Sequence, residues 1–312
     1  MIAEEALPKL GEKPPKVSVC VVTYNQEKYI TQCLQSIVDQ QTDFEFEIIV
    51  GDDCSTDGTK KIIQRFAKEY PNLIRPIFNS ENLGAFQNYF SVHRAARGTY
   101  VAHVDGDDWT RPEKLQIQSD YLDAHGQASL AAHRMRVWEK EMEVRSTAVN
   151  PGVISIDYLL RRHPIFMNSS IMYRRLLFLD LFEKGKPMID YYLYIYAATK
   201  GAIGFLNDIL GDYRSNIGIS SKRDLMPYIQ EAIDLAECEF GNSQAVRRAR
   251  AKAYLSYAVA NLLQGNNAKF YELNKAASSA DFWWMRPRII RLFGTNPQAL
   301  KRMVHMYKKA KW

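Results

Sequence analysis

Apolar residues between positions 17 and 109 alternate between short runs of strand length and stripes of helical spacing. VSVCVV, starting at Val17, is a β-branched run that predicts a strand, and TYNQ ends it with turn-forming residues. After Asn25, which we expect to cap a helix, apolar residues recur at helical spacing as far as Val38. The chain is therefore predicted to open with a strand, a loop and a helix.

The same order recurs twice more along the chain. FEIIV predicts a strand, GDDCSTDG a loop, and a stripe from Ile62 to Tyr70 a helix that ends before Pro71. IRPIF, NSENLGAF and a helix ended by Gly98 make the third unit, and TYVAHV predicts a fourth strand. Strands alternating with helices predict an α/β fold with right-handed crossovers and a mostly parallel sheet flanked by helices.

The pattern changes after Pro112. We expect a helix to about His125, a strand from Leu130 to Val137, and mixed elements to about residue 220. From Asp224 onward the sequence pattern predicts helices, with stretches such as AVRRARAKAYLSYAVANLLQ and NNAKFYELNKAASSA. The predicted organisation is a flexible lead over residues 1–16, an α/β domain over 17–222, and a C-terminal helical region with a basic aromatic tail over 223–312.

The composition is that of a globular protein that can bury a large core. The 312 residues are 46% hydrophobic, yet no apolar run approaches the roughly 20 residues that cross a bilayer. The N-terminus has acids and prolines in place of an apolar signal core, which predicts a cytoplasmic protein without a cleaved signal. No CxxC spacing occurs, so reduced structural thiols are expected at Cys20, Cys33, Cys54 and Cys238.

The net charge of +6 is concentrated at the C-terminus. After Asp281 the chain has eight basic residues and no acidic one, which leaves the remainder at −2. A near-neutral body with a basic tail argues against a nucleic-acid binder. The tail segment FWWMRPRIIRLF mixes tryptophan with arginine, which suits either peripheral attachment to an anionic membrane surface or packing of the aromatic rings on the body.

Polar residues follow three of the predicted strands, where ligands bind in open α/β sheets. Asp105, Asp107 and Asp108 in DGDD are crowded acids that either form a solvated turn or hold Mg²⁺ or Mn²⁺ with the phosphates of a substrate. Asp52 and Asp53 either cap the next helix or face a ligand. Because a carboxylate only accepts hydrogen bonds, a ligand-facing acid would select uracil or guanine over cytosine.

Four successive segments resemble the motifs of the inverting family 2 glycosyltransferases of GT-A fold, of the bacterial surface-polysaccharide type. The segments are VSVCVVTYNQEKYI, EIIVGDDCSTDGT, NLGAFQN and GTYVAHVDGDDW, and they agree with the family in order and spacing over residues 17–109. A later stretch, MIDYYLYIYAATKGAIGFLNDILGDYRSNIGIS, resembles the family segment that contains an acidic pair, a helix and a YRxH sequence.

The resemblance implies a role for individual residues. The predicted nucleotide contacts are Thr23, Tyr24 and Asn25 beside the nucleotide, Asp53 at the base with Asp52 next to it, Asn82 and Gly84 beside the nucleoside, and Asp105 at the ribose. Asp107 is the expected ligand of Mn²⁺ or Mg²⁺ on the diphosphate, and Asp105 and Asn216 are further candidates. Asp190 matches the general base that takes the proton of the acceptor hydroxyl.

Two positions depart from the family pattern, and two more allow alternative roles. Ile189 replaces the first acid of the pair, and Asn216 replaces the histidine of YRxH, which leaves Asp190 and Asp107 as the principal catalytic and metal-binding acids. Trp109 either stacks on a sugar or packs its loop. His163 lies in the segment expected near the acceptor, where it either contacts an acidic acceptor or is solvated, and His103 is expected to be a core residue.

These features predict a metal-dependent inverting hexosyl- or N-acetylhexosaminyltransferase. Its donor would be a nucleotide-sugar, with a UDP-sugar favoured, and its acceptor a glycan or lipid-linked hydroxyl in polysaccharide biosynthesis, such as that of O-antigen or capsule. One alternative is a non-catalytic relative that binds nucleotide or membrane and organises an assembly complex. Another is a sugar nucleotidyltransferase, but VVTYNQEKY lacks the glycines that cradle a triphosphate.

Overall fold

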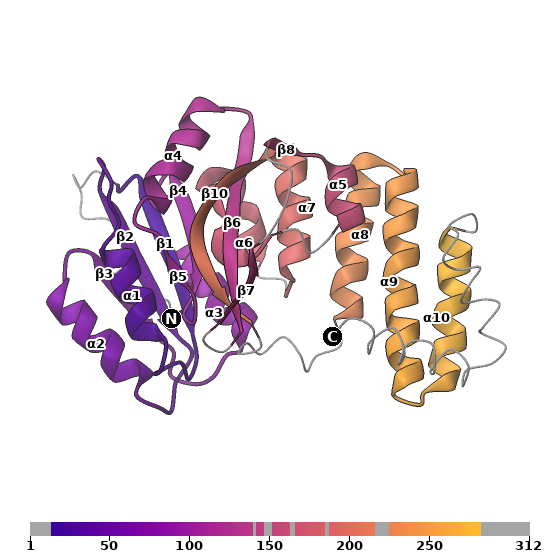
Figure 1. The fold of residues 1–312 in the computed structure, drawn as a ribbon, viewed down its shortest axis with the longest axis horizontal. Helices are drawn as coiled ribbons and strands as arrows, with labels where there is room; N and C mark the ends of the chain where they lie inside the picture. Colours follow the sequence, from indigo (N-terminus) through magenta and orange to yellow (C-terminus); the bar gives the residue numbers. More distant parts are fainter. Residues whose placement is uncertain are drawn as a thin grey trace. The chain divides into compact units, whose positions relative to one another are not determined.

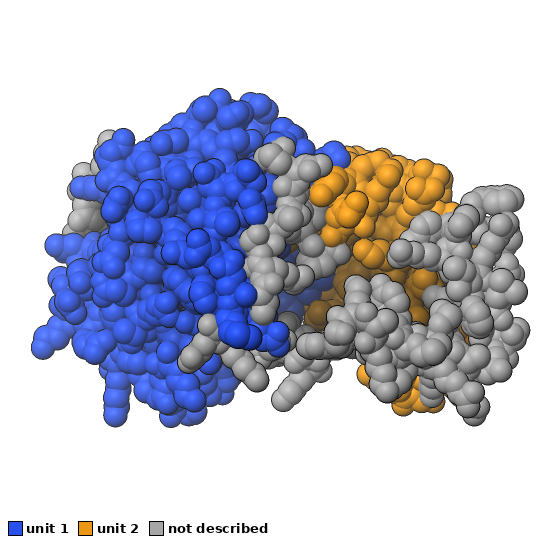
Figure 2. All heavy atoms as spheres, viewed as in Figure 1, with its two compact units in different colours: residues 1–155, 164–190, 196–222 blue, residues 156–163, 191–195, 223–312 orange. Residues whose placement is uncertain are grey.

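The computed structural model describes residues 14–139, 142–146, 152–162, 166–184, 187–215 and 225–281. The chain divides into two compact units, drawn in blue and orange in Figure 2. The first unit takes residues 1–155, 164–190 and 196–222, and the second takes residues 156–163, 191–195 and 223–312. The second unit thus includes two short segments that lie within the predicted α/β domain.

Among the described residues, the first unit contains a ten-stranded sheet (Figure 1). Its order is β3-β2-β1-β4-β9-β6-β10-β5, with β7 beside β6 and β8 beside β10. The strands are β1 (Val17–Thr23), β2 (Phe46–Asp52), β3 (Ile74–Phe78), β4 (Tyr100–Asp105), β5 (Trp109–Thr110), β6 (Ala128–Glu139), β7 (Met142–Ser146), β8 (Gly152–Ile154), β9 (Met172–Arg174) and β10 (Ala202–Arg214).

The pairings of β1 with β2 and β4, of β2 with β3, and of β6 with β10 are parallel. This confirms the predicted α/β class and the mostly parallel character of the central strands. The strands β5, β7, β8 and β9 pair antiparallel with their neighbours. They are short, so the sequence pattern did not reveal them.

Helices cover the sheet and complete the first unit. They are α1 (Ile30–Val38), α2 (Thr59–Glu69), α3 (Ala85–Arg94), α4 (Lys114–Ala124) and α6 (Leu179–Lys184), with short 3₁₀ turns η2 (Asn168–Ser170) and η3 (Arg175–Leu177). The chain adds β2 and then β3 on one side of β1 and returns to place β4 on the other side of β1, so the strand order reverses between β1 and β4. Right-handed crossovers therefore place α1 and α2 on one face of the sheet and α3 on the other.

Alternate residues of β1 contact the two faces. Val19 and Val21 belong to the core that contains the buried residues of α1 and α2. Cys20 points to the other side, where its Sγ lies 3.6 Å from the carbonyl oxygen of Val92 in α3. The period of two therefore assigns each side chain to one helical layer.

The carboxyl ends of three strands lie side by side at the point where the strand order reverses. Thr23 of β1 is in register with Asp52 of β2, and Val22 is in register with Asp105 of β4. In open α/β sheets such a switch point is where ligands bind. The fold thus brings together the polar strand ends that the sequence singled out.

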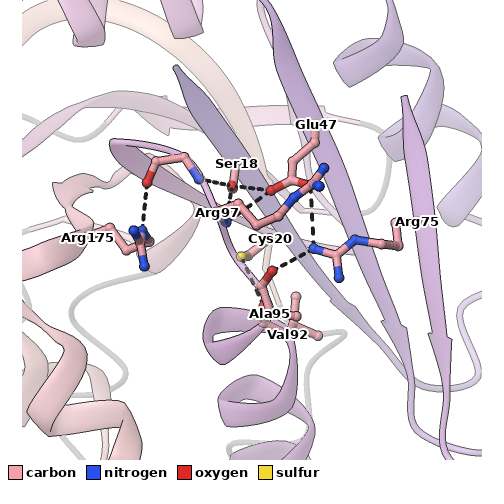
Figure 3. Close-up of polar contacts among 9 residues, drawn as sticks. Ser18, Cys20, Glu47, Arg75, Val92, Ala95, Arg97 and Arg175 are labelled. Carbon is pink, nitrogen blue, oxygen red and sulfur yellow. Dashed lines mark hydrogen bonds and ion pairs between the residues drawn. The ribbon is translucent and has the colours of Figure 1, made fainter. Parts of the chain in front are cut away.

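At the amino-terminal ends of the strands, opposite the site, Glu47 on β2 connects several elements (Figure 3). Its carboxylate accepts hydrogen bonds from the Ser18 hydroxyl at 2.6 Å and from Arg97 Nη2 at 2.9 Å, and Arg75 Nη2 lies 3.4 Å away. Burial alone would raise the pKa of Glu47, but the donors on Ser18 and Arg97 and the charge of Arg75 more than offset it and lower the pKa. Glu47 therefore links β1, β3 and the residues just before β4.

Helix α1 begins at Ile30, with Tyr29 at the capping position and no side-chain cap. The prediction that Asn25 caps this helix is therefore wrong. Asn25 adopts a positive φ of 53°, and its Oδ1 accepts a hydrogen bond from the Thr56 backbone at 2.8 Å. Its side chain connects the loop after β1 to the loop after β2, which explains why it is not free to cap.

The second unit contains α8 (Met226–Phe240), α9 (Gln244–Leu263) and α10 (Asn267–Ala280), together with α5 (Ile156–Arg162) and residues Tyr191–Ile195 of α7 (Asp190–Lys200). Helices α9 and α10 form a hairpin whose turn includes Gly265 at a φ of 89°. Its interior is a cluster of Ala258, Leu262, Phe270 and Leu273. No helix among the described residues is long and apolar enough to cross a membrane.

Candidate active site

The loop after β1 is held in place by the loop after β2. The Asn25 backbone N–H donates to Ser55 Oγ at 2.9 Å, and the Gln26 N–H donates to Thr59 Oγ1 at 2.8 Å. Thr23 is buried, and its Oγ1 lies 2.7 Å from Gln26 Oε1. Tyr24 is half-buried between these anchored residues. Two of the predicted nucleotide contacts, Thr23 and Asn25, therefore also hold the loops in place.

Asp52 and Asp53 are both buried, but their carboxylates have different partners. Asp52 accepts from the backbone and the hydroxyl of Ser55 within its own turn. Asp53 accepts from Asn79 Nδ2 at 2.9 Å, from Leu83 N at 2.8 Å and from Gly84 N at 2.9 Å. A carboxylate has about four acceptor positions, so Asp53 retains about one for a further donor.

Asp53 also sets the geometry of the segment that leads into α3. Gly84 has a φ of 85°, a conformation that favours glycine, and it precedes the first residue of α3. Asn82 donates from Nδ2 to the Asp53 carbonyl at 3.3 Å and is otherwise exposed. Asn82, Gly84 and Asp53 are thus brought together, and their contact with a nucleotide stays a prediction.

Asp105 stands at the end of β4 with both carboxylate oxygens engaged. Oδ1 lies 3.2 Å from His103 Nε2, and Oδ2 accepts from Ser169 Oγ at 3.3 Å. Burial pushes the pKa of Asp105 upward, but the hydrogen bonds from His103 and Ser169 outweigh it, so the pKa lies below the ordinary value. Asp105 therefore remains ionised near neutral pH.

Asp107 and Asp108 experience the opposite balance. Burial, followed by the negative charge of Asp105, raises the pKa of Asp107 to about 6. Burial and the charges of Asp107 and Asp105 raise the pKa of Asp108 well above its ordinary range. Asp108 Oδ1 accepts from the Arg214 backbone at 2.9 Å, whereas its buried Oδ2 has no hydrogen-bond partner among the described residues. The three acids crowd one place on the sheet edge.

Lys114, the first residue of α4, lies beneath this cluster and was not singled out from the sequence. It is fully buried, and its Nζ donates to the carbonyls of Ser169 at 2.7 Å and His103 at 3.3 Å. Burial lowers the pKa of Lys114 to about 7, against the opposing charges of Asp108 and Asp105. A lysine is almost never fully buried, so the sequence alone gave no signal for it.

Asp190 is the first residue of α7, where the helix N-terminus favours a negative charge. The residue is accessible to solvent, but the protein atoms around its carboxyl group still raise its pKa. This desolvation and then the charge of Asp105 raise the pKa of Asp190 to about 6. Asp190 thus lies within electrostatic reach of the acids at the end of β4.

Arg214, at the end of β10, is a second residue that the sequence reasoning missed. Its guanidinium donates to the Asp107 carbonyl and to Gln32 Oε1 at 2.5 Å, and its central carbon lies 4.3 Å from the centroid of the Trp109 ring. Trp138 packs against the same ring with centroids 5.7 Å apart. Trp109 therefore packs against side chains of β6 and β10, and because its ring is only half-buried, stacking on a sugar stays a prediction. The YRSN stretch was the signal that could have identified Arg214.

The acids provide a donor set that fits a hard divalent cation. No group of three His, Cys, Asp or Glu side chains among the described residues is arranged to hold a metal ion. Mg²⁺ and Mn²⁺ are commonly held by one or two carboxylates plus substrate phosphates. Asp107 and Asp105 can supply the carboxylates. The mutual repulsion of the carboxyl groups and the unpartnered Asp108 Oδ2 are consistent with a cation at this place.

Three predicted features lie outside the described residues. These are His163, Asn216 and the basic aromatic tail after Asp281. The predicted contact with the acceptor and the predicted membrane contact therefore remain expectations from the sequence.

In sequence, the chain is similar both to a family of known proteins and to individual members of other organisms' proteomes. The model of the family described as Glycosyl transferase family 2 matches residues 18–182. An uncharacterized protein of Mycobacterium tuberculosis is 38% identical over 203 residues, which cover 64% of this chain and 58% of that protein. EpsE of Bacillus subtilis, a proposed glycosyltransferase, is 31% identical over 227 residues, which cover 70% of this chain and 80% of EpsE. The chain thus spans less than two thirds of the mycobacterial relative.

A solved structure shares the fold at lower sequence identity. TarS 1–349 of Staphylococcus aureus in complex with UDP-GlcNAc matches with a TM-score of 0.66 and 21% identity, covering 92% of this chain and 88% of that chain. Full-length TarS is named a poly(ribitol-phosphate) beta-N-acetylglucosaminyltransferase, and 114 of its residues are 39% identical to this chain, covering 35% of this chain and 19% of TarS. The structural match shows the fold, including the α/β sheet and the helical C-terminal region.

Proposed function

The chain belongs to glycosyltransferase family 2, and from this premise we propose that it transfers a sugar from a nucleotide-sugar to a hydroxyl group of a glycan or lipid-linked acceptor. A UDP-sugar is the favoured donor, and polysaccharide biosynthesis is the proposed context. The observation that carries the proposal is the position of Asp53 and the DGDD acids at the carboxyl ends of β2 and β4, on the two sides of β1. Asp190 is close enough to this place for the charge of Asp105 to raise its pKa.

The nucleoside part of the donor would bind at the ends of β1, β2 and β4. The acceptor position that remains on Asp53 suits the N3–H of uracil, because cytosine has no hydrogen at that nitrogen. Gly84 permits close approach of the backbone, with Asn82, Thr23, Tyr24 and Asn25 flanking the nucleotide, and Asp105 would accept from a ribose hydroxyl. Because the internal partners of Asp53 already order this loop, little conformational entropy remains to be lost on binding.

Asp107, with Asp105 beside it, would hold Mn²⁺ or Mg²⁺ against the donor diphosphate. When bound, the cation supplies Lewis-acid stabilisation of the negative charge that develops on the leaving diphosphate. Arg214 orders the backbone of this loop through the Asp107 carbonyl and the Asp108 carboxylate. Lys114, with a pKa of about 7, would limit the repulsion between the acids in its protonated form.

Asp190 would act as the general base. Its carboxylate takes the proton from the acceptor hydroxyl while that oxygen attacks the anomeric carbon, and the bond from this carbon to the diphosphate breaks. A pKa of about 6 leaves Asp190 mostly ionised at pH 7, yet basic enough to accept a proton. One displacement of this kind inverts the configuration at the anomeric carbon.

The test is turnover of a panel of UDP- and GDP-sugars with Mn²⁺, with transfer and hydrolysis both followed. UDP-GlcNAc comes first in the panel because TarS, which shares the fold, was solved with it. We expect one donor to react and Asp190→Asn to lower its turnover about 10²–10⁴-fold with nucleotide affinity unchanged. Absence of turnover with nucleotide binding intact would favour the non-catalytic relative, and an Asp190→Asn variant as active as the wild type would remove the base assignment.

A peripheral contact with the inner face of the cell membrane is proposed for the tail, on the sequence alone. Its eight basic residues and adjacent tryptophans suit an anionic interface, where each basic residue contributes roughly 1 kcal/mol. Flotation of the full chain with anionic vesicles, compared with a chain that ends at Ala280, tests this. Equal flotation of both would reject it.

A further inference from the structure

Three buried polar side chains form a hydrogen-bonded series that ends on Asp105. The Tyr173 hydroxyl on β9 lies 2.6 Å from His93 Nδ1 on α3, and His93 Nε2 lies 3.0 Å from His103 Nδ1 on β4. His103 Nε2 in turn lies 3.2 Å from Asp105 Oδ1. None of these three residues contributes to the proposed binding or proton transfer directly. We call Tyr173, His93 and His103 the relay triplet.

The relay triplet is sealed from solvent by aromatic rings. Tyr173 and His103 are fully buried and His93 is 3% exposed. The ring of Tyr89 stacks on His93 with centroids 3.9 Å apart, and Phe182 lies 5.1 Å from the same imidazole. Burial and then the neighbouring His103 lower the pKa of His93 well below its ordinary value, so His93 is neutral. Buried polar groups are costly unless they are paired, and here each has a partner.

Asp105 determines what His103 presents to it. An ionised carboxylate only accepts, so His103 carries a hydrogen on Nε2. The neutral His93 imidazole has one donating and one accepting nitrogen, so it can pair with His103 Nδ1 on one side and with the Tyr173 hydroxyl on the other. The donor that faces Asp105 is therefore the same whichever way the other two hydrogen bonds run.

Asp105 is held from the other side as well. Ser169 Oγ donates to Oδ2 at 3.3 Å and accepts from the Asp105 backbone N–H at 2.9 Å. With one donor on each oxygen, the plane of the carboxylate cannot rotate without breaking a hydrogen bond. The Asp105 side chain nevertheless remains 36% accessible to solvent, so its free acceptor positions face outward.

We propose that His103, oriented by His93 and Tyr173, is a positioning residue that fixes the Asp105 carboxylate to accept hydrogen bonds from a ribose hydroxyl, and that the relay triplet thereby sets the selectivity for ribose over deoxyribose. This inference rests on the proposed function, because it requires a nucleotide at the sheet edge. A site built to hydrogen-bond a hydroxyl discriminates strongly against an analogue that lacks it, whereas a carboxylate that can rotate discriminates less.

The experiment is calorimetric titration of UDP, 2′-deoxy-UDP, 3′-deoxy-UDP and CDP into the full chain in the presence of Mn²⁺. We expect the wild type to bind UDP about tenfold or more tightly than at least one deoxy analogue. In His103→Phe, which keeps an aromatic ring of similar size, this ratio should fall to within about threefold, since the donor to Asp105 Oδ1 is gone. Tyr173→Phe should reduce the ratio less, because His103 itself remains.

The ratio of UDP to CDP affinity separates positioning from general damage. It reports on Asp53, which does not contact the relay triplet, and should stay unchanged in His103→Phe. A variant that has merely lost structure would lower both ratios together. If His103→Phe does not fold, the triple variant His93→Phe/His103→Phe/Tyr173→Phe replaces the whole series by apolar rings and leaves no ring nitrogen or hydroxyl of the relay triplet unpaired. The same two affinity ratios are then measured in that variant.

The variant Asp105→Ala separates the positioning role of His103 from the nucleotide site itself. If it abolishes the ribose preference while His103→Phe retains it, the positioning role is overturned and the nucleotide site stands. If the wild type does not bind UDP, or if Asp105→Ala keeps the full ribose preference, the proposed nucleotide site fails and the positioning role fails with it.

Discussion

The acids at the sheet edge are distinguished by their hydrogen-bond partners. Asp105 has a donor on each oxygen and a lowered pKa, whereas desolvation and then the charge of Asp105 raise the pKa of Asp107 and of Asp190 to about 6. Asp53 is bound by three donors of its own loop. Residues of one chemical type can therefore serve as a base reader, a ribose contact, a metal ligand and a general base.

The pKa of Asp190 predicts how turnover depends on pH. A general base must be ionised, so kcat should rise with pH and reach half its plateau at or below about pH 6. Desolvation by the surrounding protein atoms and then the charge of Asp105 raise the pKa of Asp190 to about 6, and a bound cation would offset the charge of Asp105. The rate is measured between pH 5 and 8 at saturating donor and Mn²⁺, so that protonation of Asp107 is suppressed by the bound cation. A flat profile, or the same inflection in Asp190→Asn, would contradict this role.

At the scale of single elements, α3 packs on β2 without room for an added methyl group. A Cβ built on Gly51 would lie 2.3 Å from Val92 Cγ2 and 2.6 Å from Asn88 Oδ1. Asn88 also donates to the Gly51 carbonyl at 2.9 Å. The close approach therefore fixes the height of α3 over the sheet, and with it the N-terminus that bonds to Asp53.

We expect Gly51→Ala to lower the free energy of unfolding by about 1–3 kcal/mol, because overpacking must displace α3. Urea denaturation measures this. Gly126→Ala is the matched control, since a Cβ there has no neighbour within 4 Å and its φ is not in the left-handed region, so it should change stability by less than about 0.5 kcal/mol. Equal effects of the two substitutions would show that α3 is not packed as described.

Glu47 should contribute stability that depends on pH. Its pKa is lowered in the folded state, so its contribution is present above the ordinary glutamate pKa of about 4.3 and is lost as pH falls below that value. We expect Glu47→Gln to cost about 2 kcal/mol at pH 7, the scale of hydrogen bonds to a charged group. The difference in unfolding free energy between wild type and variant should shrink from pH 7 to pH 4; a difference that grows on acidification would refute the assignment.

How far the sequence predicts the elements depends on their length and periodicity. The strands β1 to β4 and helices α1, α2, α9 and α10 were predictable because β-branched runs or helical stripes mark each of them. The three-residue strands β8 and β9 have too few residues to show a period. Ser169 was not predictable as a partner of Asp105, since 64 residues separate them and a serine has no distinguishing pattern.

The site itself was predictable in part. The strand-end acids of β2 and β4 lie together because parallel strands end at one edge, which sequence order alone implies. Lys114 was missed because the burial of a lysine is a tertiary arrangement with no local signal. Arg214 was missed because the YRSN stretch marks the segment but does not show that the arginine lies over a tryptophan. The role of Asn25 was predicted wrongly for the same reason: its side chain bonds to the loop after β2 and does not cap α1, and this tertiary contact has no local signal in the sequence.

At the scale of the whole molecule, the two units have separate apolar clusters. The cluster of the α9–α10 hairpin contains Phe270, which is fully buried, whereas its neighbour Tyr271 is 48% exposed. Phe270→Ala should cost about 3–5 kcal/mol, the usual range for a buried phenylalanine. Hydrogen exchange should then show lost protection between residues 225 and 281, and Tyr271→Ala should show little change.

The UDP affinity of Phe270→Ala should remain within about twofold of the wild type, because the proposed nucleotide contacts all belong to the first unit. If protection is lost equally in β1 to β4, the two units unfold together and this separation is wrong.

The most direct measurement of the central claim is calorimetric titration of UDP and CDP with and without Mn²⁺, in the wild type and in Asp107→Asn. The account predicts that UDP binds at least about tenfold more tightly than CDP, and that removal of Mn²⁺ or of the Asp107 carboxylate weakens UDP at least about tenfold. Affinities that are equal for UDP and CDP and indifferent to Mn²⁺ and to Asp107 would contradict a nucleotide-sugar site at the ends of β1, β2 and β4.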